Sequence, residues 1–290
     1  MKIIAAIIVP LVLVTALPAA AADAAADAQA TAADRYYDSA LMARARQQLN
    51  AENGGMRTYA VMIDQLEAGF NAEDETYAWD AQGWYGGDIH RFWWKSEGEG
   101  AFDSNIEDAE LQLLYSRAVT PYFDIQTGIR QLYAEGEHRT DLVLGTQGLA
   151  PYWFEVGAAV FISTDGDVTA RAEAEYDLRL TQKIILQPIA ELNAAAQDIS
   201  DLDLSAGLTD FTAGLRLRYE LSRRFAPYIG VEWTSTLGET RTVRKSLGED
   251  TQSTRALIGV RALFEGEGRP LWQKFSISSA RRSRFLRRRH

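Results

Sequence analysis

Carboxylates spaced two residues apart are the feature of this chain with the clearest chemical potential. Glu173 and Glu175 alternate with alanines in Ala170–Leu178, and Asp80 and Glu155 lie in other segments of alternating polarity. Side chains two residues apart in a β-strand point to the same face, so Glu173 and Glu175 are expected to form one acidic surface. Carboxylates attract cations, but transition metals usually recruit His or Met side chains as well.

Imidazole and thioether groups are scarce in the same part of the chain. Met56, Met62, His90 and His138 are the only ones near the alternating segments, and a lone residue of this kind is more often structural than a ligand. A competing interpretation of the carboxylates is that they pair with bases and brace the inside of the fold. The candidate metal ligands are Asp80, His90, Glu155, Glu173, Glu175 and Met62.

The elements that carry these residues alternate apolar with polar side chains over about ten residues, which predicts β-strands with one apolar and one polar face. Short turns alternate with longer loops, among them residues 96–104, 197–207 and 237–252. The strands are predicted at residues 58–70, 76–85, 88–96, 105–118, 122–134, 139–147, 151–163, 168–180, 183–196, 208–221, 226–236 and 253–264.

This pattern predicts an all-β fold, a transmembrane antiparallel outer-membrane β-barrel of about twelve strands. A soluble sandwich would alternate as well, but its strands usually have about five or six residues, against about 9–11 for a tilted transmembrane strand. The strand pattern is least clear at residues 139–147. If this strand and one neighbour were absent, the barrel would have about ten strands. A base facing the lipid midplane would cost about 2–4 kcal/mol, so the charged face must be the lumen.

Aromatic residues near the predicted strand ends are expected to form girdles at the two membrane interfaces, although core packing would also explain them. These residues are Trp79, Tyr85, Trp93, Tyr115, Tyr122, Phe123, Tyr152, Phe154, Tyr176, Tyr219, Trp233 and Phe264.

The N-terminal residues 1–22 have one lysine, an apolar run and small residues before Asp23, which predicts a secretory signal peptide. A spanning helix is the alternative, but the run is shorter than the roughly 20 residues that a bilayer requires. Residues 23–55 are expected to form a flexible or weakly helical periplasmic segment, with the barrel at 56–264. Residues 265–290 form a basic tail, expected to be disordered, that is either a periplasmic extension or the product of a shifted reading frame.

The net charge is −10, although residues 265–290 contain eight Lys or Arg against two Glu. The rest of the chain is therefore more acidic than the total. An acidic body disfavours nucleic acid as a partner and favours cations.

Enzymatic chemistry has little support in the sequence. The chain has no cysteine, which excludes disulfides, thiol catalysis and thiolate metal sites. A serine hydrolase needs Ser and His within hydrogen-bond reach, and neither His90 nor His138 has a partner that the sequence can place. We therefore expect no catalytic residue. A phospholipase-like outer-membrane hydrolase and a general or structural porin remain the alternative functions.

Several longer motifs resemble the outer-membrane copper resistance protein B family (the CopB/PcoB type). They are MIDQLE (62–67), WDAQGWYGGD (79–88), RFWWKSEGEG (91–100), GLAPYWFE (148–155), AEYD (174–177), LQP (186–188), GLRLRYE (214–220) and FAPYIGVEW (225–233). The resemblance implies an outer-membrane barrel in copper tolerance that binds copper ions and could translocate them. It also implies outer-membrane lipids and periplasmic copper-handling proteins as partners.

The chain departs from the family pattern in two places. Members often carry a Met- and His-rich segment before the barrel, whereas residues 23–55 contain only Met42 and no His. Any metal site is therefore expected in the barrel itself. Such barrels also normally end at a terminal aromatic residue, and here residues follow Phe264.

Overall fold

The computed structural model describes residues 36–38, 40–45, 48, 57–71, 75–102, 106–134 and 137–267. The chain divides into two compact units, Met1–Gly55 and Met56–His290. In the first unit, residues 40–45 are helical, and the Asp38 carboxylate accepts a hydrogen bond from the Leu41 backbone N–H at 2.9 Å, as a helix N-cap does. The predicted signal peptide and nearly all of the predicted tail lie outside the described residues.

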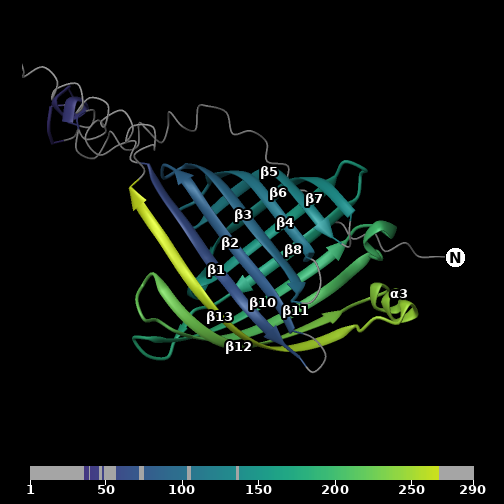
Figure 1. Ribbon diagram of the computed structural model, residues 1–290. Coiled ribbons are helices and arrows are strands. Elements are labelled where there is room, and N and C mark those ends of the chain that lie inside the picture. Colours follow the sequence, from purple (N-terminus) through teal and green to yellow (C-terminus); the bar gives the residue numbers. More distant parts are fainter. Residues whose placement is uncertain are drawn as a thin grey trace, which may run out of the picture. The chain divides into compact units, whose positions relative to one another are not determined.

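The second unit is a closed antiparallel β-barrel, which confirms the predicted fold class (Figure 1). Successive strands pair with each other, and β1 pairs with β13 to close the ring, so no strand edge is left open. The strands are β1 (Thr58–Phe70), β2 (Glu75–Gly86), β3 (His90–Ala101), β4 (Ile106–Ala118), β5 (Phe123–Ala134), β6 (Glu137–Ala150), β7 (Phe154–Ser163), β8 (Val168–Glu175), β9 (Leu178–Arg179), β10 (Ile184–Ala195), β11 (Gly207–Tyr219), β12 (Phe225–Thr236) and β13 (Gln252–Glu267).

Strands β8 and β9 are two parts of one barrel strand, so the barrel has twelve strands in all. The interruption at Tyr176 and Asp177 lies opposite Pro188 of β10. Proline has no backbone N–H to donate to the ladder, although its carbonyl still accepts a hydrogen bond from the Tyr176 N–H at 3.2 Å. The predicted strand at 168–180 is therefore present but split at the proline.

Each strand places one set of side chains in the lumen and the other on the outer wall. In β4, Glu110 and Gln112 are buried inside the barrel, while Leu111, Leu113 and Tyr115 are exposed outside. This arrangement confirms that the polar face lines the lumen. It leaves an apolar outer wall, as a membrane-spanning barrel requires.

A small apolar cluster inside the barrel corrects one of the aromatic predictions. Trp93, Leu114, Val143 and Phe161 pack together in the lumen, and the ring of Trp93 stacks on that of Trp84 at 4.8 Å between centroids. Trp93 is therefore not part of an interfacial girdle. The alternation of β3 points it inward with the charged residues on either side.

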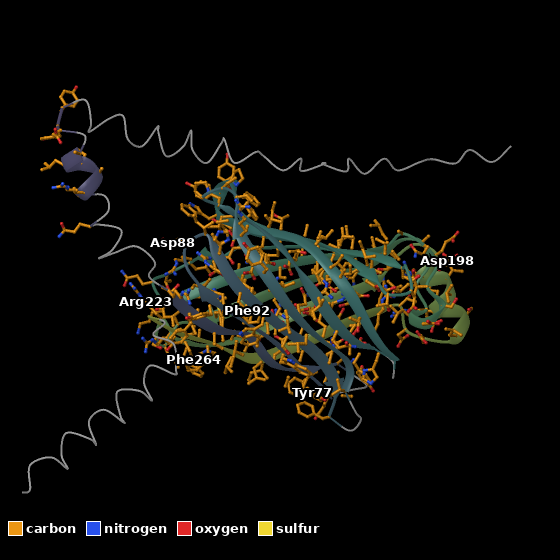
Figure 2. The ribbon with its side chains drawn as sticks, turned by 90° about the horizontal axis from the view of Figure 1, so that it is seen from above. Tyr77, Asp88, Phe92, Asp198, Arg223 and Phe264 are labelled. Atoms are coloured by element: carbon orange, nitrogen blue, oxygen red, sulfur yellow. The ribbon has the colours of Figure 1, made fainter. Side chains whose placement is uncertain are left out.

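The two ends of the barrel differ, as the loop lengths predict. Short turns such as η1 (Pro151–Trp153) lie at one end, and the other end carries longer loops that contain η2 (Ser200–Leu202) and α3 (Thr240–Leu247). Figure 2 shows Asp198 at the loop end, and Asp88 and Arg223 at the turn end. No helix among the described residues is long and apolar enough to cross a membrane.

Strand β3 is longer than predicted, because residues 97–101 continue the ladder with both neighbours instead of forming a loop. The acidic, glycine-rich composition of this segment suggested a loop. Its alternation is nevertheless that of a strand, with Glu97 and Glu99 inward and Gly98 outward beneath the indole of Trp79. Strand β13 likewise runs three residues past the predicted end at Phe264.

Replacement of Gly98 by valine tests this packing. A Cβ atom at Gly98 would lie 2.3 Å from the Trp79 ring and 2.9 Å from the backbone oxygen of Asp108, so the ring must move and lose its hydrogen bond to Ser96. We expect Gly98→Val to lower the free energy of unfolding by about 1–3 kcal/mol. The measurement is the urea midpoint for loss of the fast, unboiled band on a gel. The control is Ala172→Val on the exposed outer wall, and an equal midpoint for both variants would contradict the packing.

Candidate functional site

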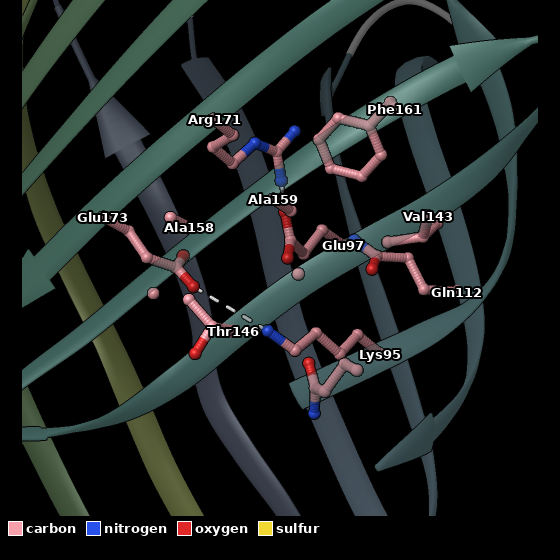
Figure 3. A pocket seen from close by; sticks show the side chains of 13 residues that line it. Lys95, Glu97, Gln112, Val143, Thr146, Ala158, Ala159, Phe161, Arg171 and Glu173 are labelled. Carbon is pink, nitrogen blue, oxygen red and sulfur yellow. Dashed lines mark hydrogen bonds and ion pairs between the residues drawn. The ribbon is translucent and has the colours of Figure 1, made fainter. Parts of the chain in front are cut away.

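The first charged network in the lumen centres on Arg171 of β8, which reaches across the barrel to β3 and β4. Its guanidinium donates to Glu97 at 2.8 Å and to Glu110 at 3.1 Å (Figure 3 shows Arg171 beside Glu97). Arg130 extends the network, because it donates to Asp141 at 2.8 Å and lies 3.4 Å from Glu110. The Arg171 contacts tie β8 to strands on the opposite side of the barrel, and Arg130 joins the neighbouring strands β4, β5 and β6.

A second bridge between β3 and β8 lies two residues closer to the turn end on each strand. The Lys95 ammonium is 3.7 Å from the Glu173 carboxylate, and both side chains project into the lumen (Figure 3). A small cavity of about 20 Å³ lies between this bridge and the Arg171 network. These two cross-barrel contacts leave little open space in the lumen at this level, which is called the narrow region below.

Another network surrounds Arg216 of β11, which is almost fully buried. It pairs with Glu67 of β1 at 2.9 Å and with Glu232 of β12 at 3.1 Å. Tyr228 also donates a hydrogen bond to Glu67 at 2.8 Å, and Arg255 lies 3.5 Å from Glu232. Buried charges are stable only when paired in this way, and here each carboxylate has more than one donor.

A bulge in β1 places two consecutive residues in the lumen. The pairing of β1 with β2 shifts by one residue between Ile63 and Gln65, so Asp64 and Gln65 both point inward. Asp64 accepts a hydrogen bond from Gln82 at 2.7 Å and pairs with Arg261 at 3.1 Å. Gln65 accepts from the Arg216 guanidinium at 3.1 Å.

Beyond the narrow region, the lumen widens toward the loop end into an acidic cavity of about 480 Å³. Nine of its lining residues are acids and four are bases. The acids are Glu67, Asp80, Glu97, Glu99, Asp108, Glu110, Glu191, Asp210 and Glu232, and the bases are Arg130, Arg171, Arg244 and Arg255. The excess of carboxylates makes this cavity attractive to cations.

The loops around this end of the barrel are acidic as well. Residues 164–167, 196–206 and 237–251 contain eight Asp or Glu against three Lys or Arg. A cation that approaches from the loop side therefore meets negative potential before it enters the cavity.

Most of the candidate metal ligands lie in the lumen, but at different levels. Asp80 lines the acidic cavity and interacts electrostatically with Asp64, Glu97 and Glu173. Glu173 stands at the narrow region, where it pairs with Lys95. Among the described residues, no three His, Asp or Glu side chains converge as a preformed metal site.

Glu175, Glu155 and Met62 lie closer to the turn end. Glu155 and Glu175 are direct cross-strand partners on β7 and β8, a position where like charges repel. Gln187 donates a hydrogen bond to Glu175 at 2.8 Å. The sulfur of Met62 accepts from the Arg261 guanidinium at 3.3 Å, so the thioether faces the same part of the lumen.

His90 is not brought together with the other candidates. Its side chain lies on the outer wall, where its Nδ1 is 2.5 Å from the hydroxyl of Tyr115 and the two rings stack. The sequence already places His90 on the face opposite Arg91 and Lys95. His138 is also exposed, and its ring packs against Tyr133.

Several of the lining acids could not be placed in the lumen from the sequence. Gly98 and Gly100 suggested a loop for Glu97 and Glu99, although the spacing of two between these acids is that of a strand. Asp64 and Glu67 are three residues apart, and only the bulge brings both into the lumen. A bulge leaves no reliable signal in one sequence, so the structure was needed to find this pair.

Removal of the Arg216 charge tests the pairing inside the barrel. We expect Arg216→Met to lower the free energy of unfolding by about 3–5 kcal/mol, because Glu67 would remain buried without its base. The double variant Arg216→Met with Glu67→Met should regain most of this loss. Arg179→Met removes the exposed base of a 3.8 Å pair and should cost less than about 1 kcal/mol. Equal urea midpoints for Arg216→Met and Arg179→Met would contradict the network.

The comparison with known proteins agrees with these features. A sequence model of the family described as Copper resistance protein B precursor (CopB) matches residues 57–264. Copper resistance protein B of Escherichia coli is 42% identical over 206 residues, which cover 71% of this chain and 69% of that protein. The Copper resistance protein B homolog of Pseudomonas syringae pv. tomato (strain ATCC BAA-871 / DC3000) is 37% identical over 227 residues, 78% of this chain and 76% of the homolog.

Among solved structures, the NanC porin is similar with a TM-score of 0.48 and 12% sequence identity, over 70% of this chain and 98% of the porin. The match to the family model extends over the whole described barrel except the last residues of β13. Together with the identities to the two relatives, it shows that this chain belongs to the copper resistance protein B family.

Proposed function

We propose that this chain contributes to copper resistance in the bacterial outer membrane by binding copper ions in the barrel lumen and translocating them. The observation that carries the proposal is the acidic cavity, whose nine carboxylates outnumber its four bases. Membership of the copper resistance protein B family indicates copper as the metal, and the excess of carboxylates in the cavity favours a cation there. The role is one of binding and transport and involves no catalysis.

The candidate ligands divide the proposed route into stages. Asp80 receives the cation in the cavity, and Glu173 takes part at the narrow region once it exchanges Lys95 for the metal. Glu175 and Glu155 then form the next stage, because a cation between them would offset the repulsion of two facing carboxylates. Met62 offers a thioether near this stage, a ligand that suits copper better than most other metals.

The surroundings of the barrel follow from the same proposal. The short turns face the periplasm and the acidic loops face the exterior, as in other barrels of this class. Residues 1–22 act as the export signal and 23–55 lie in the periplasm, where copper-handling proteins would exchange metal with the turn end. The outer wall contacts membrane lipids.

Loss of two luminal carboxylates tests the site directly. We expect Glu173→Gln with Glu175→Gln to weaken copper binding by about tenfold, since each lost charge removes one favourable electrostatic contact. Growth of cells in copper should decline in parallel. Binding is measured by titration of the purified barrel, and tolerance is measured at equal barrel abundance.

Two controls keep this test specific. Glu107→Gln makes the same chemical change at an exposed position near the loop end of β4, and His90→Ala alters the outer wall. Both should bind copper like the unaltered protein. If the double variant matched Glu107→Gln in binding and tolerance, copper would not use the luminal carboxylates.

Ion currents distinguish a copper route from a general porin. In a planar bilayer, copper ions should reduce the monovalent cation current through the barrel, because they occupy the carboxylates that line the route. Magnesium at the same concentration should have a much smaller effect, and the Glu173→Gln, Glu175→Gln variant should lose the copper effect. Equal reduction by both metals in both proteins would instead favour a porin without metal preference.

A further inference from the structure

A groove on the outer wall of the barrel is separate from the lumen and from any copper route. It crosses β3, β4 and β5, is open to the outside and has a volume of about 510 Å³. The outward side chains that line it are His90, Phe92, Leu113, Tyr115, Thr127 and Ile129. The intervening residues of these strands point inward, so their backbone forms the floor of the groove.

The groove is apolar along its length and polar at one end. Phe92, Leu113 and Ile129 are all exposed outside the barrel, and Thr127 is the small side chain between the larger ones. The apolar part runs from the turn end toward the middle of the wall. The outer wall faces lipid and not water. An apolar groove in this wall therefore suits an acyl chain.

The polar end carries residues that suit an anionic headgroup. His90 begins β3 immediately after the turn, and its direct cross-strand partner is Arg117, an exposed base near the end of β4. Tyr115 holds the imidazole through the 2.5 Å contact to Nδ1, which leaves Nε2 directed away from that contact. An imidazole and a guanidinium side by side can both donate hydrogen bonds to a phosphate.

We propose that this groove binds one phospholipid of the periplasmic leaflet, with the phosphate at His90 and Arg117 and one acyl chain along Phe92, Leu113, Thr127 and Ile129. The occupant follows from the order of the chemistry along the wall. Cationic and hydrogen-bonding groups lie at the level of the short turns, and the apolar hollow extends from them into the membrane. This order is that of a phospholipid, and it gives His90 a role that does not involve metal.

Native mass spectrometry of the full-length barrel tests the proposal. The protein is folded into vesicles of phosphatidylglycerol and phosphatidylethanolamine, extracted in mild detergent, and examined for retained phospholipid. Thr127→Trp fills the groove, and His90→Gln with Arg117→Gln removes the headgroup contacts. The control is Lys183→Gln, another base near the turn end, whose ammonium lies 5.9 Å from the Tyr219 ring and outside the groove.

We expect the unaltered protein and Lys183→Gln to retain one phospholipid, and both groove variants to retain it about tenfold less, as the loss of charge-assisted hydrogen bonds or of the acyl site would cause. The shift in gel mobility on boiling verifies that each variant is folded. Equal retention in all variants, or equal loss in Lys183→Gln, would overturn the proposal. Displacement of the bound molecule by inorganic phosphate would also overturn it, since a phosphate ion alone would then explain the headgroup contacts.

Discussion

The need to neutralise charge inside a narrow barrel determines most of this structure. Closure of the sheet gives the backbone N–H and C=O groups their hydrogen bonds. It also places every second side chain in the confined space of the lumen. Many of those side chains are charged, and a buried charge without a partner is strongly destabilising. The contacts of Arg171 and Arg216 are the result, because a base on one strand pairs with an acid on a strand that is not its neighbour.

This neutralisation is complete in some places and incomplete in others. Around Arg216, Glu67 and Glu232 each have more than one donor, so these two of the nine cavity acids are already neutralised. The other seven acids of the cavity still outnumber its four bases, and the balance there is left negative. The same residue types therefore have two effects in one lumen, and the local ratio of acids to bases decides which region is suited to bind metal.

The alternation of polar and apolar residues predicted the barrel well, because every strand points its side chains inward and outward in turn. The strand that begins at Thr58 and the charged inner face of β4 follow directly from it. The site was less predictable, because contacts across the lumen join strands that are far apart in sequence. Nothing in one sequence pairs Arg171 with Glu97, and the glycines at 98 and 100 obscure the strand alternation of Glu97 and Glu99. Alternation along β3 places Trp93 on the inner face with Arg91 and Lys95. Its aromatic side chain instead suggested a position in the interfacial girdle.

The bulge at Asp64 and Gln65 makes the lumen adjustable without a change in the outer wall. Because one extra residue is accommodated there, deletion of a single residue would restore regular pairing of β1 with β2 and remove one polar group from the interior. The residues on either side would keep their faces. Descendants of this sequence could therefore gain or lose a luminal charge through one codon inserted or deleted at the bulge, whereas the same event elsewhere in β1 would turn its apolar side chains inward.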